Sequence, residues 1–238
     1  MLEFTIYTSA DSPGFAALYG LFRNSFPDPD EAEEFDDIVL SFLLPGKKEL
    51  TRRYGEFHEY WIAAKENGRL LGGVNVSVFR ASCSAHVNYV FTSKDCRRRG
   101  VGSALLEKAA EISGVDWLFC EQNDPGLMSS GELESDFAAA GISCDERIAW
   151  WRHRGFRKLG MRYVQPPLSP EKEPVTHMSL NVCVDADAVS VAGTVVAEHL
   201  RRFYYIAVLK GRADWHPFVE SLLSYVRSRF EIPLETVQ

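Results

Sequence analysis

The fold of this chain is decided by residues 90–104, which have the sequence VFTSKDCRRRGVGSA. The apolar residues at the start of this stretch predict the end of a β-strand, and an amphipathic helix is expected from Val101. A short basic loop and the two glycines Gly100 and Gly102 join the strand to the helix. The stretch therefore predicts a strand–loop–helix unit that has glycines at the start of its helix.

The start of such a helix is suited to binding a phosphate group. Its first backbone N–H groups have no partner within the helix, and the helix dipole adds partial positive charge there. Gly100 and Gly102 would let an anion approach the backbone closely, and Arg97, Arg98 and Arg99 add fixed positive charge. The alternative is a solvated basic turn whose glycines serve only helix–strand packing. The position between a strand and a helix, in an acidic chain, favours a pyrophosphate site.

The residues before this stretch predict two helices and an antiparallel sheet. Residues 2–8 are expected to form a strand, and Ser12-Pro13 is typical of a helix start. A second amphipathic helix is expected over 35–42. Three strands near 60–64, 70–79 and 86–92 then predict an antiparallel meander, with a hairpin turn around Asn67-Gly68.

The residues after the stretch complete a mixed α/β fold. The helix from Val101 ends at Gly114, and a buried strand over 115–120 is expected to run parallel to the strand at 86–92, which makes a βαβ unit. The further predicted elements are helices over 132–140, 145–153, 187–209 and 215–230, and strands over 163–164 and 177–184. The chain thus predicts one core domain with a helical C-terminal extension.

Composition excludes several classes of function. The 238 residues carry a formal net charge of -7, whereas a general nucleic-acid binder is expected to carry an excess of positive charge. No run of about eighteen apolar residues predicts a membrane span, and the N-terminus does not resemble a signal peptide. The five cysteines and six histidines lack disulfide or metal-ligand spacing, so we expect no metal and a reduced, cytoplasmic setting.

Two motifs resemble those of the GNAT N-acetyltransferases. RRRGVG at 97–102 is similar to the family signature Q/R-x-x-G-x-G/A, and WRHRGF at 151–156 is similar to Y-x-x-x-G-F. The resemblance covers roughly residues 2–185 and includes the order of strands and helices. It implies a GNAT-like fold with a central, mostly antiparallel mixed sheet, a βαβ cofactor-binding unit and flanking helices.

The resemblance also implies a cofactor and the residues that bind it. The donor is expected to be acetyl-CoA, and the acceptor an amine of a small molecule or peptide. The strand backbone would pair with the pantetheine arm, and the signature would hold the pyrophosphate. The expected cofactor-binding residues are Val90, Phe91, Thr92, Arg97, Arg98, Arg99, Gly100, Val101, Gly102, Ser103, Ala104, Asn123 and Trp151.

The sequence departs from the family pattern at two places. The spacing between Asn123 and the aromatic residue Trp151 is much longer than in the family. Residues 124–145 are therefore expected to be an insertion that either shapes the acceptor pocket or only adds to the surface. Trp151 stands where the family often has a tyrosine that protonates the departing thiolate. An indole N–H has no useful acidity, so Trp151 can only donate a hydrogen bond or pack.

Three side chains are candidates for proton transfer. An ammonium group must lose a proton before it attacks, and Glu121 is the first candidate for the base because it ends the strand beside the expected cleft. It could equally cap the following turn or pair with an arginine. His86 is a second candidate, although a strand histidine more often satisfies a local hydrogen bond. Tyr163 could replace the missing acid or be a half-buried core tyrosine.

These expectations combine into one function and two alternatives. The first prediction is an N-acetyltransferase domain over 1–185 that acts by direct transfer, with residues 186–238 as a helical extension. The extension could cover the sheet of its own chain or form a homodimer contact. The alternatives are a non-catalytic acyl-CoA sensor and an acyltransferase that uses a longer acyl chain.

Overall fold

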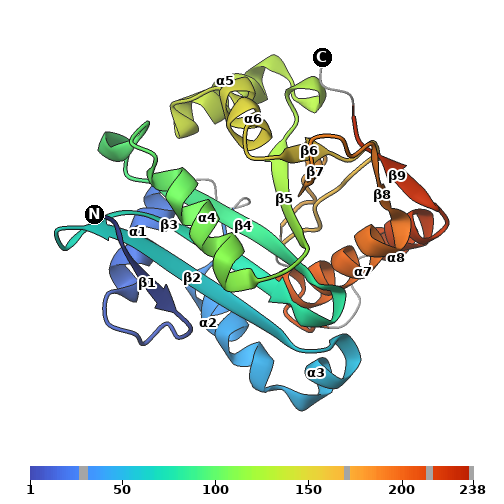
Figure 1. The fold of residues 1–238 in the computed structure, drawn as a ribbon, viewed down its shortest axis with the longest axis horizontal. Coiled ribbons are helices and arrows are strands. Elements are labelled where there is room, and N and C mark those ends of the chain that lie inside the picture. Colours follow the sequence, from blue (N-terminus) through green and yellow to red (C-terminus); the bar gives the residue numbers. More distant parts are fainter. Residues whose placement is uncertain (27–31, 169–171, 213–216, 236–238) are drawn as a thin grey trace. The chain divides into compact units, whose positions relative to one another are not determined.

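The computed structural model describes residues 1–26, 32–168, 172–212 and 217–235 (Figure 1). The chain divides into two compact units, Met1–Asp116 and Trp117–Gln238. The predicted mixed α/β fold class is confirmed, because helices flank β-strands in both units. Each unit is described by itself below.

The first unit contains a four-stranded antiparallel sheet. Its strands lie in the order β1 (Glu3–Tyr7), β2 (Phe57–Glu66), β3 (Arg69–Phe79) and β4 (Ser84–Thr92). Asn67 and Gly68 both have positive φ, 51° and 76°, as a tight two-residue hairpin turn requires. The predicted meander is therefore confirmed, with strands slightly longer than the apolar runs suggested.

Helices cover both faces of this sheet. Helices α1 (Phe15–Ser25) and α2 (Phe35–Leu43) lie on one face and α4 (Val101–Ser113) on the other, while α3 (Lys48–Tyr54) precedes β2 (Figure 1). The core under α1 and α2 is aromatic and includes fully buried Trp61. The expected helix start at Ser12-Pro13 is wrong, because α1 begins after Gly14, whose φ of 88° is left-handed.

The second unit has a three-stranded antiparallel sheet, one helix within the expected insertion and a second helix that follows it. Strand β7 (Met178–Cys183) lies between β5 (Trp117–Asn123) and β6 (Phe156–Lys158). Helices α5 (Ser130–Ala140) and α6 (Cys144–Arg152) agree with the predicted helices, and each begins with a serine–glutamate capping box.

One predicted strand of this unit is absent. Tyr163 and Val164 lie in a loop, and the strand after the GF motif is β6. Pro166 and Pro167 follow Val164 closely, and prolines have no N–H with which to extend a sheet ladder. Tyr163 is nevertheless buried, as expected of a core tyrosine.

The C-terminal residues form helices and a small two-stranded antiparallel sheet. Strands β8 (Ser190–Ala192) and β9 (Glu231–Pro233) pair and flank the helices α7 (Gly193–Arg202) and α8 (Pro217–Arg227), and a π-helix (Phe203–Val208) extends α7. The helix predicted from 187 therefore begins later, and residues 215–216 of the second predicted helix lie outside the described part of the chain.

The extension packs on its own unit. The ring of His199 in α7 stacks on Phe119 of β5 with centroids 3.9 Å apart, and Tyr204 stacks on Tyr163 at 6.4 Å. The helix and the π-helix that extends it thus contact β5 and the loop at Tyr163.

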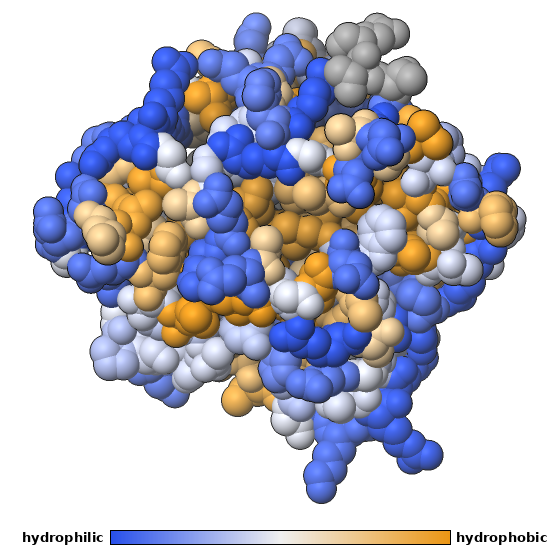
Figure 2. Space-filling model, in the orientation of Figure 1, coloured by the Kyte–Doolittle hydropathy of each residue, from blue (hydrophilic) through white to orange (hydrophobic). Residues whose placement is uncertain are grey.

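The surface combines polar and apolar residues. Figure 2 shows hydrophilic side chains over most of the face in view, with smaller apolar areas between them. Among the described residues, large apolar side chains with high exposure include Val189 at 76% and Phe230 at 91%. Single exposed apolar residues are normal and do not by themselves indicate a site. No helix in the described ranges has the length and hydropathy needed to cross a membrane.

Candidate functional site

The loop before α4 leaves the start of that helix open. Gly100 has φ 78° and ψ 0°, and no side chain caps the helix that begins at Val101. A Cβ atom built on Gly100 would meet nothing within 4 Å. The first intrahelical bond runs from the Ala104 N–H to the Gly100 carbonyl at 3.0 Å, so the amides of Val101 and Gly102 precede the hydrogen-bonded part of the helix. The start of α4 therefore presents backbone N–H groups that no side chain caps.

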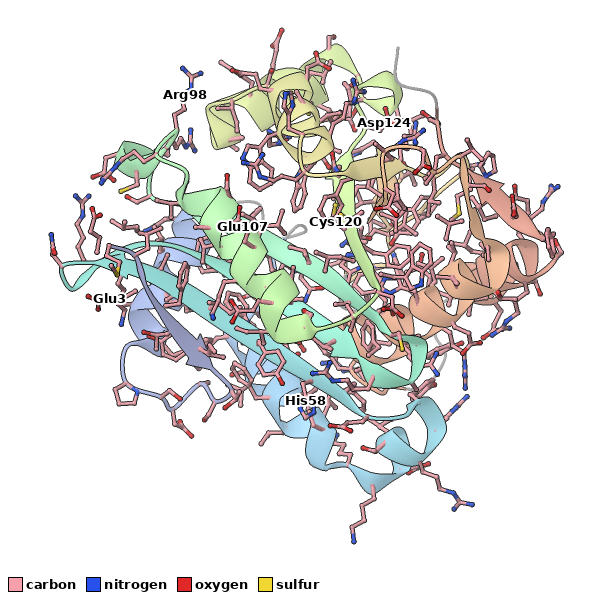
Figure 3. The ribbon with its side chains drawn as sticks, in the orientation of Figure 1. Glu3, His58, Arg98, Glu107, Cys120 and Asp124 are labelled. Atoms are coloured by element: carbon pink, nitrogen blue, oxygen red, sulfur yellow. The ribbon has the colours of Figure 1, made fainter. Side chains whose placement is uncertain are left out.

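The three arginines of this loop have different surroundings. Arg99 Nη2 lies 2.8 Å from Glu66 Oε2, so its charge is already paired. Arg98 adopts a left-handed φ of 60°, and its exposed side chain points outward from the loop (Figure 3). Arg97 is part-buried. The loop itself is held by the ion pair of Arg69 with Asp95.

The end of β4 precedes this loop. Val90, Phe91 and Thr92 pair with Val74, Gly73 and Gly72 of β3. The Phe91 ring belongs to the aromatic core and is 4% exposed, whereas Val90 and Thr92 are part-buried. The backbone of these three residues is expected to pair with the pantetheine arm, and the burial of the Phe91 side chain in the core is compatible with that role.

His86 lies earlier on β4, in the interior of the first unit. It is fully buried, and this burial lowers its pKa to about 3. The imidazole is therefore neutral over the physiological range and holds no readily exchanged proton.

In the second unit, the structure brings Glu121 and Tyr163 together. The Tyr163 hydroxyl donates a hydrogen bond to Glu121 Oε1, and Gln165 Nε2 donates to Oε2 at 3.3 Å. Burial raises the pKa of Glu121 to about 7, and the bond from Tyr163 acts in the opposite direction. A carboxylate with this pKa can accept a proton near neutrality.

The tyrosine itself is held as a neutral phenol. Burial, followed by the charge of Glu121, raises the pKa of Tyr163 well above its usual value. Tyr204 from the π-helix stacks on this ring, and its hydroxyl donates to the Val164 carbonyl at 3.3 Å. Gln165 and Tyr204 were missed in the sequence, because no local pattern connects them to Glu121.

The insertion holds Asn123 at the end of β5. Asn123 Nδ2 donates to Asp136 Oδ1 at 3.0 Å, and Arg147 Nη2 lies 2.7 Å and 2.8 Å from the two oxygens of Asp136. Cys144 Sγ contacts Asp136 Oδ2 at 3.2 Å. Helices α5 and α6 therefore anchor to a residue expected to contact the cofactor.

Trp151 packs within its own region of the second unit. Its ring is edge-to-face with Trp150 at 4.8 Å and with Phe156 at 4.7 Å. An indole cannot act as a general acid, so the structure supports a packing role for Trp151.

Among the described residues, no group of three or more His, Cys, Asp or Glu side chains is arranged so that it could hold a metal ion.

Comparison with known proteins points to one family. Residues 15–125 match the model of the acetyltransferase (GNAT) family. A solved structure from Bacteroides thetaiotaomicron, assigned to the GNAT acetyltransferases, is similar with TM-score 0.57 and 20% identity, over 87% of this chain and 98% of that one. An acyl-CoA N-acyltransferase from Pseudomonas aeruginosa aligns with TM-score 0.47 and 16% identity, over 77% and 100%. Comparison with the curated proteins finds no match.

Proposed function

Because residues 15–125 match the model of the GNAT acetyltransferase family, we propose that this chain is a member of that family and transfers an acetyl group from acetyl-CoA to an amine of a small molecule or peptide. The match to this family supports use of an acyl-CoA, and acetyl as the acyl group and an amine as the acceptor are the more specific parts of the proposal. The observation that best supports them is the uncapped start of α4 at Gly100 within the family signature.

The start of α4 would hold the pyrophosphate of the cofactor. The amides of Val101 and Gly102 supply donors, and the helix dipole favours the negative charge. Gly100 leaves space for the phosphate oxygens, and Arg97 and Arg98 add positive charge. Arg99 would contribute less, because Glu66 already neutralises it.

Glu121 is our proposed general base. An ammonium group passes one proton to the Glu121 carboxylate, and the free amine nitrogen then attacks the thioester carbonyl carbon. As the C–N bond forms and the C–S bond breaks, CoA leaves as a thiolate. The nitrogen then loses one further proton to solvent, and the amide product of a primary amine keeps one N–H. A pKa of about 7 suits this role, because the carboxylate is both populated and basic at neutral pH.

The other two catalytic candidates take lesser parts in this proposal. Tyr163 acts as a positioning residue that orients Glu121 and opposes the effect of burial on its pKa. We assign no proton transfer to His86, because its pKa of about 3 leaves it a very weak base. We further propose that residues 1–185 form the acyltransferase domain and that residues 186–238 support it.

The test is acetyl transfer itself. Acetyl-CoA and a panel of polyamines, amino acids, aminoglycosides and N-terminal peptides are incubated with the protein, thiol release is followed, and acetylated products are identified by mass. We expect at least one amine to gain 42 Da with stoichiometric CoA release. Cofactor binding without turnover of any amine would contradict the proposal.

One observation favours a second candidate, a non-catalytic acyl-CoA sensor. Trp151 occupies the place of the family's usual acid and packs against Phe156. A sensor would bind acetyl-CoA with no amine-dependent thiol release, so the same assay separates the two functions.

A further inference from the structure

A row of buried polar side chains crosses the sheet of the first unit from β2 to β4. Glu59 is 8% exposed, Asn75 is fully buried and Ser77 is 3% exposed. Glu59 Oε1 accepts hydrogen bonds from Trp61 Nε1 and from Asn75 Nδ2, both at 3.1 Å. Asn88 on β4 ends the row, because its Nδ2 donates to Asn75 Oδ1 at 2.6 Å and to Ser77 Oγ at 2.9 Å.

The chemistry of this row fixes the orientation of both amides. An indole can only donate, so Glu59 Oε1 acts as an acceptor. Asn75 must therefore present its NH₂ group to Glu59, and the same group also donates to the Tyr60 carbonyl at 3.2 Å. The Asn75 oxygen is left facing Asn88, which must present its own NH₂ group in turn. Asn88 is thereby locked with its oxygen pointing away from the row.

That oxygen has no hydrogen-bond donor among the described residues. Asn88 Oδ1 is buried and accepts no bond from any residue that the structure describes. A buried acceptor of this kind is costly unless another molecule supplies a donor. The acceptor polarity cannot be reversed without breaking the bonds of Asn75.

The backbone also singles out this position. Asn75 pairs with Tyr89 and Val76 with Val87, so Asn88 is the extra residue of a β-bulge. A bulge re-aims a side chain, and bulges are frequent beside active sites. Asn88 thus has two features that are typical of a residue that contacts a ligand. Its Oδ1 is a hydrogen-bond acceptor of fixed orientation, and it lies at a β-bulge.

We propose that Asn88 Oδ1 accepts a hydrogen bond from an N–H of the acceptor amine, with Glu59 and Asn75 as the residues that hold it in this orientation. The proposal rests on the amine acetyltransferase function given above. Thioester and phosphate oxygens cannot be this partner, because they also accept hydrogen bonds. The rival donors are the amide N–H groups of the pantetheine arm and a water molecule.

The test measures KM separately for the two substrates, using an amine that the wild-type protein acetylates. In Asn88→Ala we expect KM for the amine to rise about tenfold, while KM for acetyl-CoA stays unchanged. Asn75→Ala keeps the acceptor but releases its orientation, so a smaller rise in the same constant is expected. Asn181→Ala removes another buried strand asparagine, which donates to Ser179, and should leave both constants unchanged.

Each outcome decides the proposal. An unchanged amine KM in Asn88→Ala overturns it and leaves water as the partner, and a raised KM for acetyl-CoA alone overturns it in favour of the pantetheine amides. If thermal melting shows that Asn88→Ala is unfolded, Asn88→Ser is measured against the same expectations. Absence of any amine turnover by the wild type defeats the proposed function and this inference together, whereas wild-type turnover with an unchanged variant defeats the inference alone.

Discussion

The Tyr163 hydroxyl donates a hydrogen bond to Glu121 Oε1, although 42 positions separate the two residues in the sequence. Burial raises the pKa of this carboxyl group to about 7, and the bond from Tyr163 limits the rise because it stabilises the charged form. The pair therefore gives the second unit a base that is poised near neutral pH.

Replacement of the base should slow the reaction. In Glu121→Gln we expect kcat to fall about 100-fold or more at pH 7, because the amide cannot take a proton from the ammonium group. The affinity for acetyl-CoA, measured by calorimetry, should stay at the wild-type value. Glu134→Gln, on the exposed surface of α5, is the matched control and should keep wild-type kcat. Equal rates for wild type and Glu121→Gln would remove this residue as the base.

Loss of the tyrosine hydroxyl should move the pH profile. In the wild type, kcat/KM is expected to rise with pH through about 7 as Glu121 loses its proton. Tyr163→Phe removes the bond that lowers the pKa of Glu121, so the rising limb should shift to higher pH. Rates measured from pH 5.5 to 9 check this direction. A limb that moves to lower pH, or stays in place, would contradict the role given to Tyr163.

Acid should destabilise the first unit through His86. The histidine has a pKa of about 3 when folded and about 6.5 when unfolded, so the unfolded state binds the extra proton between these values. Stability from this group is complete above pH 6.5 and falls with decreasing pH, by up to about 1.4 kcal/mol per pH unit. Denaturant unfolding at several pH values should show a shallower acid slope in His86→Gln. The same slope in both proteins would show that His86 is already accessible to protons.

A side chain at the start of α4 should block the cofactor. Gly102→Leu is compatible with the helix but covers the backbone N–H groups at its start, so we expect acetyl-CoA affinity to fall about 10- to 100-fold. Gly131→Leu is a matched control, since Gly131 is likewise the second residue of its helix and has open space around it. Calorimetry should give unchanged affinity for the control. Similar losses in both variants would indicate a general effect on the protein.

Much of the fold could be predicted because its signals are local. A short apolar run and the turn at Asn67-Gly68 located β2 and the start of β3, β4 was expected from the run that follows, and the glycines of the signature located the start of α4. The pairing of β8 with β9 could not be predicted, because each has only three residues and their partners are some forty positions apart. Apolar periodicity extended the helix across β8 instead.

The sequence could predict individual residues of the candidate site, but it could not predict which of them lie in contact. Glu121, Tyr163 and His86 were singled out by type and position, yet only the fold joins Tyr163 to Glu121 and buries His86 fully. Gln165 follows Glu121 by 44 positions and precedes two prolines, so nothing in its surroundings signals the contact. Asn88 was missed because its importance depends on a bulge and on the bonds of its neighbours.

The central claim is that the uncapped start of α4 binds a CoA pyrophosphate. Isothermal titration of the wild-type protein with acetyl-CoA tests it most directly. We predict one site per chain with Kd below about 100 µM, that is, a binding free energy of about −5.5 kcal/mol or better. No measurable binding at millimolar acetyl-CoA would contradict the account.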